Sequence, residues 1–103
     1  MTIIRLNNFE IESIKQSFQA YFLPDDQLWI FGSRVNPHAT GGDIDLYVNT
    51  HYTDAQKIVE AKILFLTALQ LKIGEQKIDL VVQFNNHELP IYTIAQTQGI
   101  QLL

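Results

Sequence analysis

Cysteine is absent from this chain of 103 residues, so disulfide bonds and zinc sites built on thiolates are excluded. Histidine is scarce, and its three residues do not follow the spacing of a metal-ligand motif (His38, His51 and His87). No apolar run reaches the roughly 18 residues that a membrane-spanning helix needs, and no basic and apolar leader opens the chain. We therefore expect a cytoplasmic protein that makes no contact with a membrane.

Positive charge is also in short supply. Seven Lys and Arg stand against eleven Asp and Glu, which gives a net charge of −4. Proteins that bind a nucleic-acid backbone usually present a basic face, so direct nucleic-acid binding is not expected. Hydrophobic residues make up 47% of the chain, which favours one small packed domain over residues 1–103. A domain of this size buries only about two thirds of its unfolded surface, so a partner that covers apolar area would stabilise it.

The stretch from residue 28 to 48 contains the strongest functional signal. The apolar residues from Leu28 to Phe31 predict a short buried strand. Gly32 ends this strand, because a residue without Cβ allows an unusual backbone conformation and close approach of a ligand. Ser33 then offers a hydroxyl and a backbone N–H, which suit phosphate oxygens. The alternative is a Gly-Ser turn that binds nothing.

Two aspartates follow a Gly-Gly turn at the start of the second predicted strand. Because side chains alternate along a strand, Asp43 and Asp45 share one face while Ile44 takes the other. Their Cα atoms are expected about 6.6 Å apart. Two carboxylates at this spacing can share one Mg²⁺ or bracket a pair of metal ions, whereas without a cation their like charges repel. The alternative is an exposed strand start with two solvated acids.

A third aspartate sits in a later apolar segment. Residues 76 to 84 predict a strand, and the apolar neighbours of Asp79 predict burial on both faces of the sheet. A lone buried carboxylate is costly unless it is paired or binds metal. If this strand lies beside the first acidic strand, Asp79 joins the other two aspartates around one cation. The alternatives are an ion pair with Lys77 or Lys62, or a position at an exposed sheet edge.

These elements together resemble the nucleotidyltransferase (DNA polymerase β-like) superfamily, whose signature is Gly-Ser, a loop, Asp-x-Asp on a strand and a third Asp on a later strand. The small size resembles its minimal nucleotidyltransferases, the antitoxin partners of HEPN-domain toxins. Phe-Gly-Ser-Arg-Val, Gly-Gly-Asp-Ile-Asp-Leu, and Gly-Glu-Gln-Lys-Ile-Asp-Leu-Val-Val around Asp79 produce this likeness, which spans nearly the whole chain. Nine residues separate Ser33 from Asp43, one fewer than in the commoner minimal pattern.

The resemblance implies a protein adenylyltransferase that moves AMP from ATP to a tyrosine of a HEPN toxin, as a type VII-like antitoxin. It implies a site with two Mg²⁺ ions held by three catalytic acids (Asp43, Asp45 and Asp79), with Asp79 as the general base. The nucleotide-binding residues that it implies lie at the two ends of the loop (Gly32, Ser33, Arg34 and Gly42). By residue type, Arg34 can also balance the acids or serve at the surface.

Two other functions stay open. The chain can neutralise a HEPN partner by complex formation alone, with its acids vestigial or merely holding metal. Its small size and the apolar character of its second predicted helix motivate this alternative. Transfer to a small molecule such as an aminoglycoside is a weaker alternative, since such enzymes usually need an added domain to hold the acceptor.

Helical spacing predicts three helices around these strands. The first begins at Asn7 or Asn8 as N-cap and ends before a Pro24-Asp25-Asp26 turn, where we expect the two acids to have no catalytic role. The second covers about 55 to 71, after a cap at Thr53 or Asp54, and the third about 90 to 97. The second helix is apolar beyond what one sheet needs, which indicates either a helix wedged against another helix or a partner-binding surface.

The order of elements predicts the fold class. Residues 2 to 6 predict a short edge strand or an apolar arm, and residues 100 to 103 predict a final strand or a cover for a sheet edge. We expect an α/β (α+β) domain, with a nucleotidyltransferase-like small mixed sheet and helices packed mainly on one face. The acids are then expected on the opposite face or at a sheet end.

Overall fold

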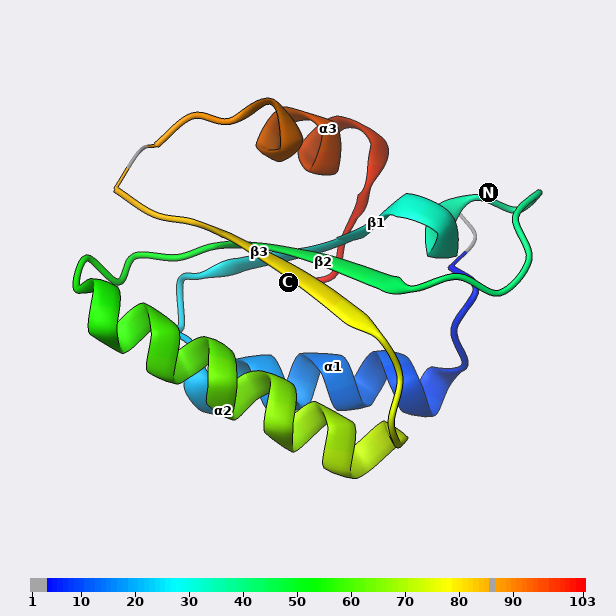
Figure 1. Ribbon diagram of the computed structural model, residues 1–103, viewed down its shortest axis with the longest axis horizontal. Coiled ribbons are helices and arrows are strands. Elements are labelled where there is room, and N and C mark those ends of the chain that lie inside the picture. Colours follow the sequence, from blue (N-terminus) through cyan, green and yellow to red (C-terminus); the bar gives the residue numbers. More distant parts are fainter. Residues whose placement is uncertain (1–3, 86) are drawn as a thin grey trace.

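The computed structural model describes residues 4–85 and 87–103, so residues 2 and 3 of the predicted N-terminal segment lie outside the described part. Within those ranges the chain forms a compact α/β domain with one mixed four-stranded sheet (Figure 1). The helices are α1 (Asn8–Tyr21), α2 (Ala55–Ile73), α3 (Pro90–Gln98) and the short 3-10 helix η1 (Gly32–Val35). The strands are β1 (Gln27–Phe31), β2 (Ile44–Asn49), β3 (Ile78–Gln83) and β4 (Ile100–Gln101). The predicted fold class is confirmed.

Side-chain caps begin the two long helices. The Asn7 side chain accepts a hydrogen bond from the Glu10 N–H at 2.8 Å, and the Glu10 carboxylate accepts one from the Asn7 N–H at 3.1 Å. This reciprocal pair is a capping box. Asp54 caps α2 by accepting a hydrogen bond from the Gln56 N–H at 2.9 Å. The structure therefore selects Asn7 and Asp54 from the two alternatives that the sequence left open for each cap.

The sheet has the strand order β3–β2–β1–β4. β2 runs antiparallel to β1 and parallel to β3, with α2 as the crossover between the parallel pair. β4 pairs with β1 and forms the edge of the sheet opposite β3. Of the two alternatives for residues 100 to 103, the structure thus shows a final strand. β3 is therefore an edge strand. Burial of Asp79 on both faces is a wrong prediction, because at this edge its side chain is exposed.

The two faces of the sheet have different cores. Figure 1 shows α1 and α2 side by side under one face, while α3 covers part of the other. Alternate residues of β2 are fully buried against α1 and α2 (Ile44, Leu46 and Val48). Tyr47 points the opposite way and packs with Trp29 and Tyr92 beneath α3. This is the alternation that the sequence predicted, and it places Asp45 on the α3 face of the sheet.

A buried polar network attaches α3 to this second face. The Tyr47 hydroxyl donates to the Gln83 side chain and accepts a hydrogen bond from Gln96 Nε2 of α3 at 2.8 Å. Burial raises the pKa of the Tyr47 hydroxyl, although the Gln96 hydrogen bond opposes the increase. The network therefore satisfies a fully buried hydroxyl and links β2, β3 and α3.

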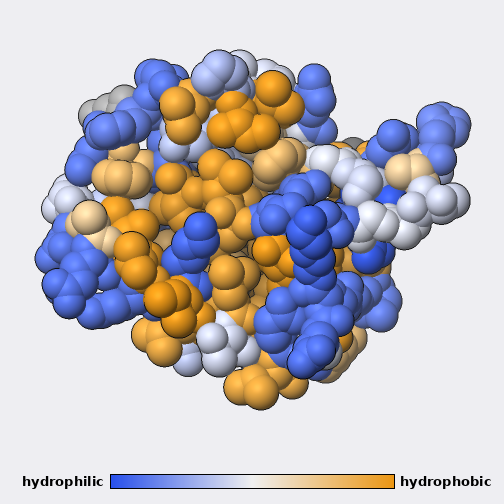
Figure 2. All heavy atoms as spheres, in the orientation of Figure 1, coloured by the Kyte–Doolittle hydropathy of each residue, from blue (hydrophilic) through white to orange (hydrophobic). Residues whose placement is uncertain are grey.

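The outer surface of α2 is apolar as well. Its buried side contains residues that the helical spacing predicted, and it packs against α1 and the sheet (Ile58, Ala61, Phe65 and Leu69). Other apolar side chains of α2 are exposed (Val59, Ile63, Leu64 and Leu71). Figure 2 shows hydrophobic atoms across the middle of the viewed face and hydrophilic atoms toward the projecting loop. Within the described residues, no helix combines the length and apolarity needed to cross a membrane.

Candidate functional site

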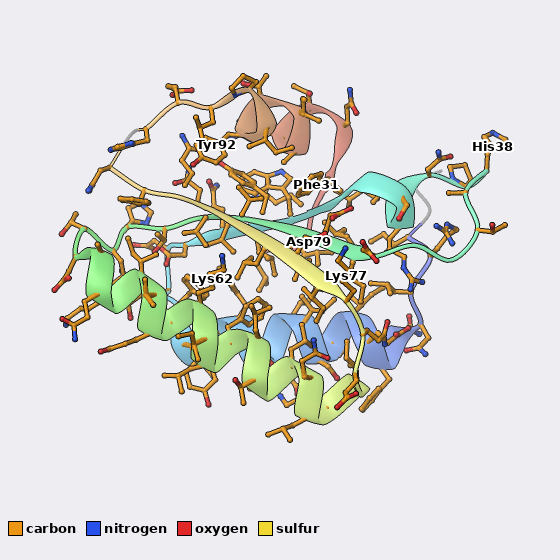
Figure 3. All side chains as sticks on the ribbon, in the orientation of Figure 1. Phe31, His38, Lys62, Lys77, Asp79 and Tyr92 are labelled. Carbon is orange, nitrogen blue, oxygen red and sulfur yellow. The ribbon has the colours of Figure 1, made fainter. Side chains whose placement is uncertain are left out.

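Three aspartates meet where β2 and β3 begin. Asp45 is paired with Asp79 in the parallel register and with Phe31 on the other side. Asp43 lies one residue before β2, and its charge acts on Asp45. Figure 3 shows Asp79 and Lys77 together at this end of β3. The predicted condition for a shared cluster was that the strand of Asp79 lies beside the strand of Asp45, and the structure meets it. The three acids therefore form one cluster, although Asp43 and Asp79 are 36 positions apart in the sequence.

Asp45 has the most unfavourable surroundings of the three. Burial raises the pKa of its carboxyl above the usual range, and the charges of Asp79 and Asp43 raise this pKa further. A hydrogen bond that the protonated Asp45 carboxyl donates to Asp79 acts in the same direction, whereas the charge of Lys77 lowers the pKa. Among the described residues, no N–H group donates to the Asp45 carboxylate. The cluster therefore has an excess of negative charge that a cation would relieve.

Lys77 neutralises part of this charge. Its Nζ lies 3.3 Å from Asp43 Oδ2, and the hydrogen bond to Asp43 is the largest cause of the raised pKa of Lys77. One alternative expected Lys77 to pair with Asp79. In the structure Lys77 pairs with Asp43 instead. The other expected partner, Lys62, forms no ion pair among the residues at 4–85 and 87–103, and Figure 3 shows it on α2, well away from Asp79. The Lys77 side chain is 72% exposed, so solvent weakens its ion pair.

The Gly32 turn touches the acid cluster directly. Gly32 has φ +74°, and a Cβ at this position would overlap the Asp45 carboxylate. Only glycine therefore fits, for both conformational and steric reasons. At the other end of the loop, the Ser33 hydroxyl donates to the Asp43 carbonyl at 3.3 Å, and a Cβ on Gly42 would overlap that hydroxyl. Three of the four residues predicted to bind nucleotide thus lie against the acids or against each other.

A groove of about 480 Å³ opens beside this turn. Its lining comes from the turn, the following loop and the end of α3 (Gly32, Ser33, Val35, Asn36, Pro37 and Gln98). The volume falls within the range of small-molecule sites. His38 is exposed, and Figure 3 shows it at the tip of the projecting loop, away from Asp79.

Two arginines hold this region together. Arg34, the fourth predicted nucleotide-binding residue, turns its Nη1 to the Arg5 carbonyl at 2.9 Å and pairs with none of the acids. Arg5 is a candidate that sequence reasoning missed, because its guanidinium donates to carbonyls spread along the loop (Ser33, Asn36 and Gly41). The one available signal was a single charge inside an otherwise apolar N-terminal segment.

The cluster is not a preformed metal cage. In the part of the chain that the structure describes, no three His, Asp or Glu side chains are arranged to hold a metal ion. The Asp43–Lys77 ion pair gives a physical reason, since it turns one carboxylate toward the lysine. Asp45 and Asp79 remain the close pair of the cluster.

Comparison with protein families and curated proteins assigns this chain to no family. No protein-family model matches it, and no curated protein matches it either. Its function must therefore be inferred from the acid cluster, the Gly32 turn and the sequence motifs.

Proposed function

We propose that this chain is a Mg²⁺-dependent nucleotidyltransferase that moves AMP from ATP to a tyrosine of a HEPN-domain toxin. The observation that carries the proposal is the contact between the Gly32 turn and Asp45, which is paired with Asp79. A phosphate held at this turn would lie beside carboxylates of the kind that bind metal ions. The resemblance of the motifs supplies ATP as the substrate and the toxin as the partner. Both proteins are expected in the cytoplasm, as an antitoxin and its toxin.

The charge of the cluster supports a divalent cation. Mg²⁺ prefers carboxylate oxygens, and Asp43, Asp45 and Asp79 would hold it. The raised pKa of Asp45 fits this assignment, because crowded carboxylates gain from a positive charge between them. Asp43 must exchange Lys77 for the cation, and their exposed ion pair is weak enough to allow this. When bound, the Mg²⁺ ions would neutralise phosphate charge and stabilise the departing pyrophosphate.

The residues of the chain divide the remaining roles. Gly32 and Ser33 hold the β- and γ-phosphates through backbone N–H groups and the hydroxyl. Asp79 accepts the proton of the attacking tyrosine hydroxyl, while the tyrosine oxygen forms a bond to the α-phosphorus. The bond from the α-phosphorus to the bridging oxygen of the β-phosphate breaks, and pyrophosphate leaves. Exposure of Asp79 on an edge strand supports a protein acceptor, because a second protein can approach it there.

Transfer of labelled AMP from ATP to a HEPN partner tests the proposal. A suitable partner is a protein encoded in the neighbouring reading frame, with an Arg-x₄₋₆-His ribonuclease motif. We expect transfer by the wild type and a loss of roughly a thousandfold in Asp43→Asn and Asp45→Asn, as for other catalytic carboxylates. Asp25→Asn removes an exposed carboxylate outside the cluster and should keep the wild-type rate. Equal inactivity of the wild type and all variants would contradict transfer.

The exposed apolar side of α2 favours a second candidate function. Apolar surface of this kind marks protein interaction sites, so the chain can also neutralise its partner by binding alone. Asp45→Asn separates the two candidates in cells that produce the toxin. Growth is lost if neutralisation requires transfer, and it persists if binding suffices. Co-purification of the variant with the toxin verifies that the complex still forms.

A further inference from the structure

Arg5 lies against the loop that joins η1 to β2. Its Nε donates to the Asn36 carbonyl at 3.0 Å. Its Nη2 donates to two more carbonyls, that of Ser33 at 2.7 Å and that of Gly41 at 2.8 Å. These three carbonyls belong to η1, to the first residue after it and to the Gly-Gly turn before β2, yet they meet at one guanidinium. Arg5 therefore ties the loop into a single unit.

The backbone around Arg5 is itself fixed. The Arg5 N–H donates to the Arg34 carbonyl at 2.7 Å, and Arg34 Nη1 donates back to the Arg5 carbonyl at 2.9 Å. On either side of Arg5, Ile4 and Leu6 pack against the large core between the sheet, α1 and α2. Because the core holds the segment in place, Arg5 connects the loop to the rigid body of the domain.

The orientation of the loop carbonyls matters for an anionic ligand. Carbonyl oxygens repel phosphate oxygens, so a loop that binds a triphosphate must turn its carbonyls away from the ligand. Arg5 holds three carbonyls through charge-assisted hydrogen bonds, which are stronger than neutral ones. In a trans peptide the next N–H points opposite to the carbonyl, so the N–H groups of Arg34 and Gly42, which follow the Ser33 and Gly41 carbonyls, point away from Arg5. Asn36 is followed by Pro37, which has no N–H. The guanidinium also adds positive charge beside the groove.

We propose that Arg5 is a positioning residue that keeps the loop from residue 33 to 41 in its nucleotide-binding shape. This inference rests on the proposed transfer of AMP, which assigns the β- and γ-phosphates to Gly32 and Ser33 at the start of this loop. Arg5 acts through the loop carbonyls and does not contact the substrate. Without Arg5, ATP must bind to a loop that has first to be ordered, and this lowers its apparent affinity.

Steady-state transfer with the HEPN partner and varied Mg²⁺–ATP tests this role. We expect Arg5→Gln to raise the KM for ATP about tenfold or more while kcat changes less, since the loss lies in ATP binding. Arg5→Lys keeps the charge but lacks the planar fork that serves several carbonyls, so its KM should fall between the two. Lys57→Gln, a matched loss of positive charge at an exposed position on α2, should leave KM and kcat unchanged.

Hydrogen exchange gives a readout that does not depend on catalysis. The N–H groups of Asn36 and Ala39 donate inside the loop, at 3.1 Å and 3.3 Å. They should exchange about tenfold faster in Arg5→Lys and Arg5→Gln, whereas the amides of β1 and β2 keep their protection. Protected core strands together with a raised KM would separate a loop effect from general unfolding.

Each outcome has a distinct meaning. An unchanged KM for ATP in Arg5→Gln, with an active wild type, overturns the role of Arg5 and leaves the proposed transfer intact. An inactive wild type overturns the transfer and this role with it, even if exchange shows that Arg5 orders the loop. If Arg5→Gln does not fold, Arg5→Lys decides the question, because an unchanged KM in that variant also overturns the role.

Discussion

Asp26 and Asp45 stand at opposite ends of the β1–β2 pair, and their surroundings differ as much as their positions. Asp26 is only 5% exposed, and donors occupy both of its oxygens. Oδ2 accepts hydrogen bonds from the Leu23 N–H at 3.0 Å and the Thr50 hydroxyl at 2.7 Å. Oδ1 accepts one from the His51 N–H at 2.8 Å and lies 2.9 Å from His51 Nδ1. This carboxylate fastens the turn before β1 to the end of β2.

Asp45 has the opposite arrangement. Its neighbours are the carboxylates of Asp79 and Asp43, and Gly32 lies against its carboxylate, which is possible only because glycine has no side chain. No donor of the described chain compensates its charge as the donors around Asp26 do. A buried acid with a full set of donors supports the fold, whereas a crowded acid without donors destabilises it. Such sites are typical of function, because selection tolerates their cost only where chemistry requires them.

The largest expected effect concerns Asp26. Asp26→Ala leaves the Thr50 hydroxyl and the N–H groups of Leu23 and His51 without their acceptor, so it should lower the free energy of unfolding by about 3 kcal/mol. Urea unfolding measures this loss. The adjacent Asp25→Ala is the control, because Asp25 is exposed and its variant should stay within about 0.5 kcal/mol of the wild type. Equal effects in the two variants would show that the donors around Asp26 do not make it a stabilising residue.

A smaller effect of opposite sign is expected at Asp45. The native state keeps the Asp45 proton to a higher pH than the unfolded state, whose pKa is near 3.8. Wild-type stability should therefore fall as the pH rises from 3.8 through the raised native pKa, since the native state binds more protons there. Asp45→Asn removes the ionised group and should raise the free energy of unfolding at pH 7 by about 1 kcal/mol, allowing for solvent screening.

Urea unfolding between pH 4 and pH 8 measures this difference for Asp45→Asn. The advantage of the variant should shrink as the pH falls toward 4, because the native wild type then carries the Asp45 proton in a larger fraction of molecules. Asp25→Asn removes the same charge outside the cluster and should show no such trend. A variant that is less stable than the wild type at pH 7 would mean that Asp45 supports the fold as Asp26 does.

The smallest expected effect concerns Lys77. Lys77→Gln should leave the urea midpoint without Mg²⁺ unchanged, because the ion pair with Asp43 is exposed to solvent. Mg²⁺ binding should become tighter, since Lys77 no longer competes for Asp43. The Mg²⁺ concentration that gives half of the maximal increase in the thermal midpoint should fall about threefold. Lys57→Gln controls for the change in net charge. Unaltered or weaker Mg²⁺ binding in Lys77→Gln would show that the lysine does not occupy the place of a cation.

Local patterns predicted most of the fold and the outline of the site. Strand alternation assigned the β2 side chains to their faces, with Leu46 toward α1 and α2 and Asp45 on the opposite face. The stop after Phe31 followed from a glycine, which takes positive φ and leaves room for a carboxylate. Each of these features depends on neighbours within a few positions of the chain, where geometry and residue type are enough to decide the structure.

The errors and omissions all involve contacts between distant segments. The apolar residues around Asp79 predicted burial, but the strand order places β3 at an edge of the sheet. The sequence placed Asp26 in a turn without a catalytic role, and it gave no sign of the partners Thr50 and His51, which lie 24 and 25 positions away. Hydrophobic periodicity identifies a strand without stating which neighbours it will have.

By itself the sequence determined the elements, the two faces of β2 and the types of chemical group available to the site. Tertiary structure decided that Asp79 is paired with Asp45, that Lys77 pairs with Asp43, and that Arg5 holds a loop 31 positions away. The physical reason is that hydrogen bonds and charge interactions act over a few ångströms. They depend on which surfaces the packing of the core brings together, and no local pattern encodes that outcome.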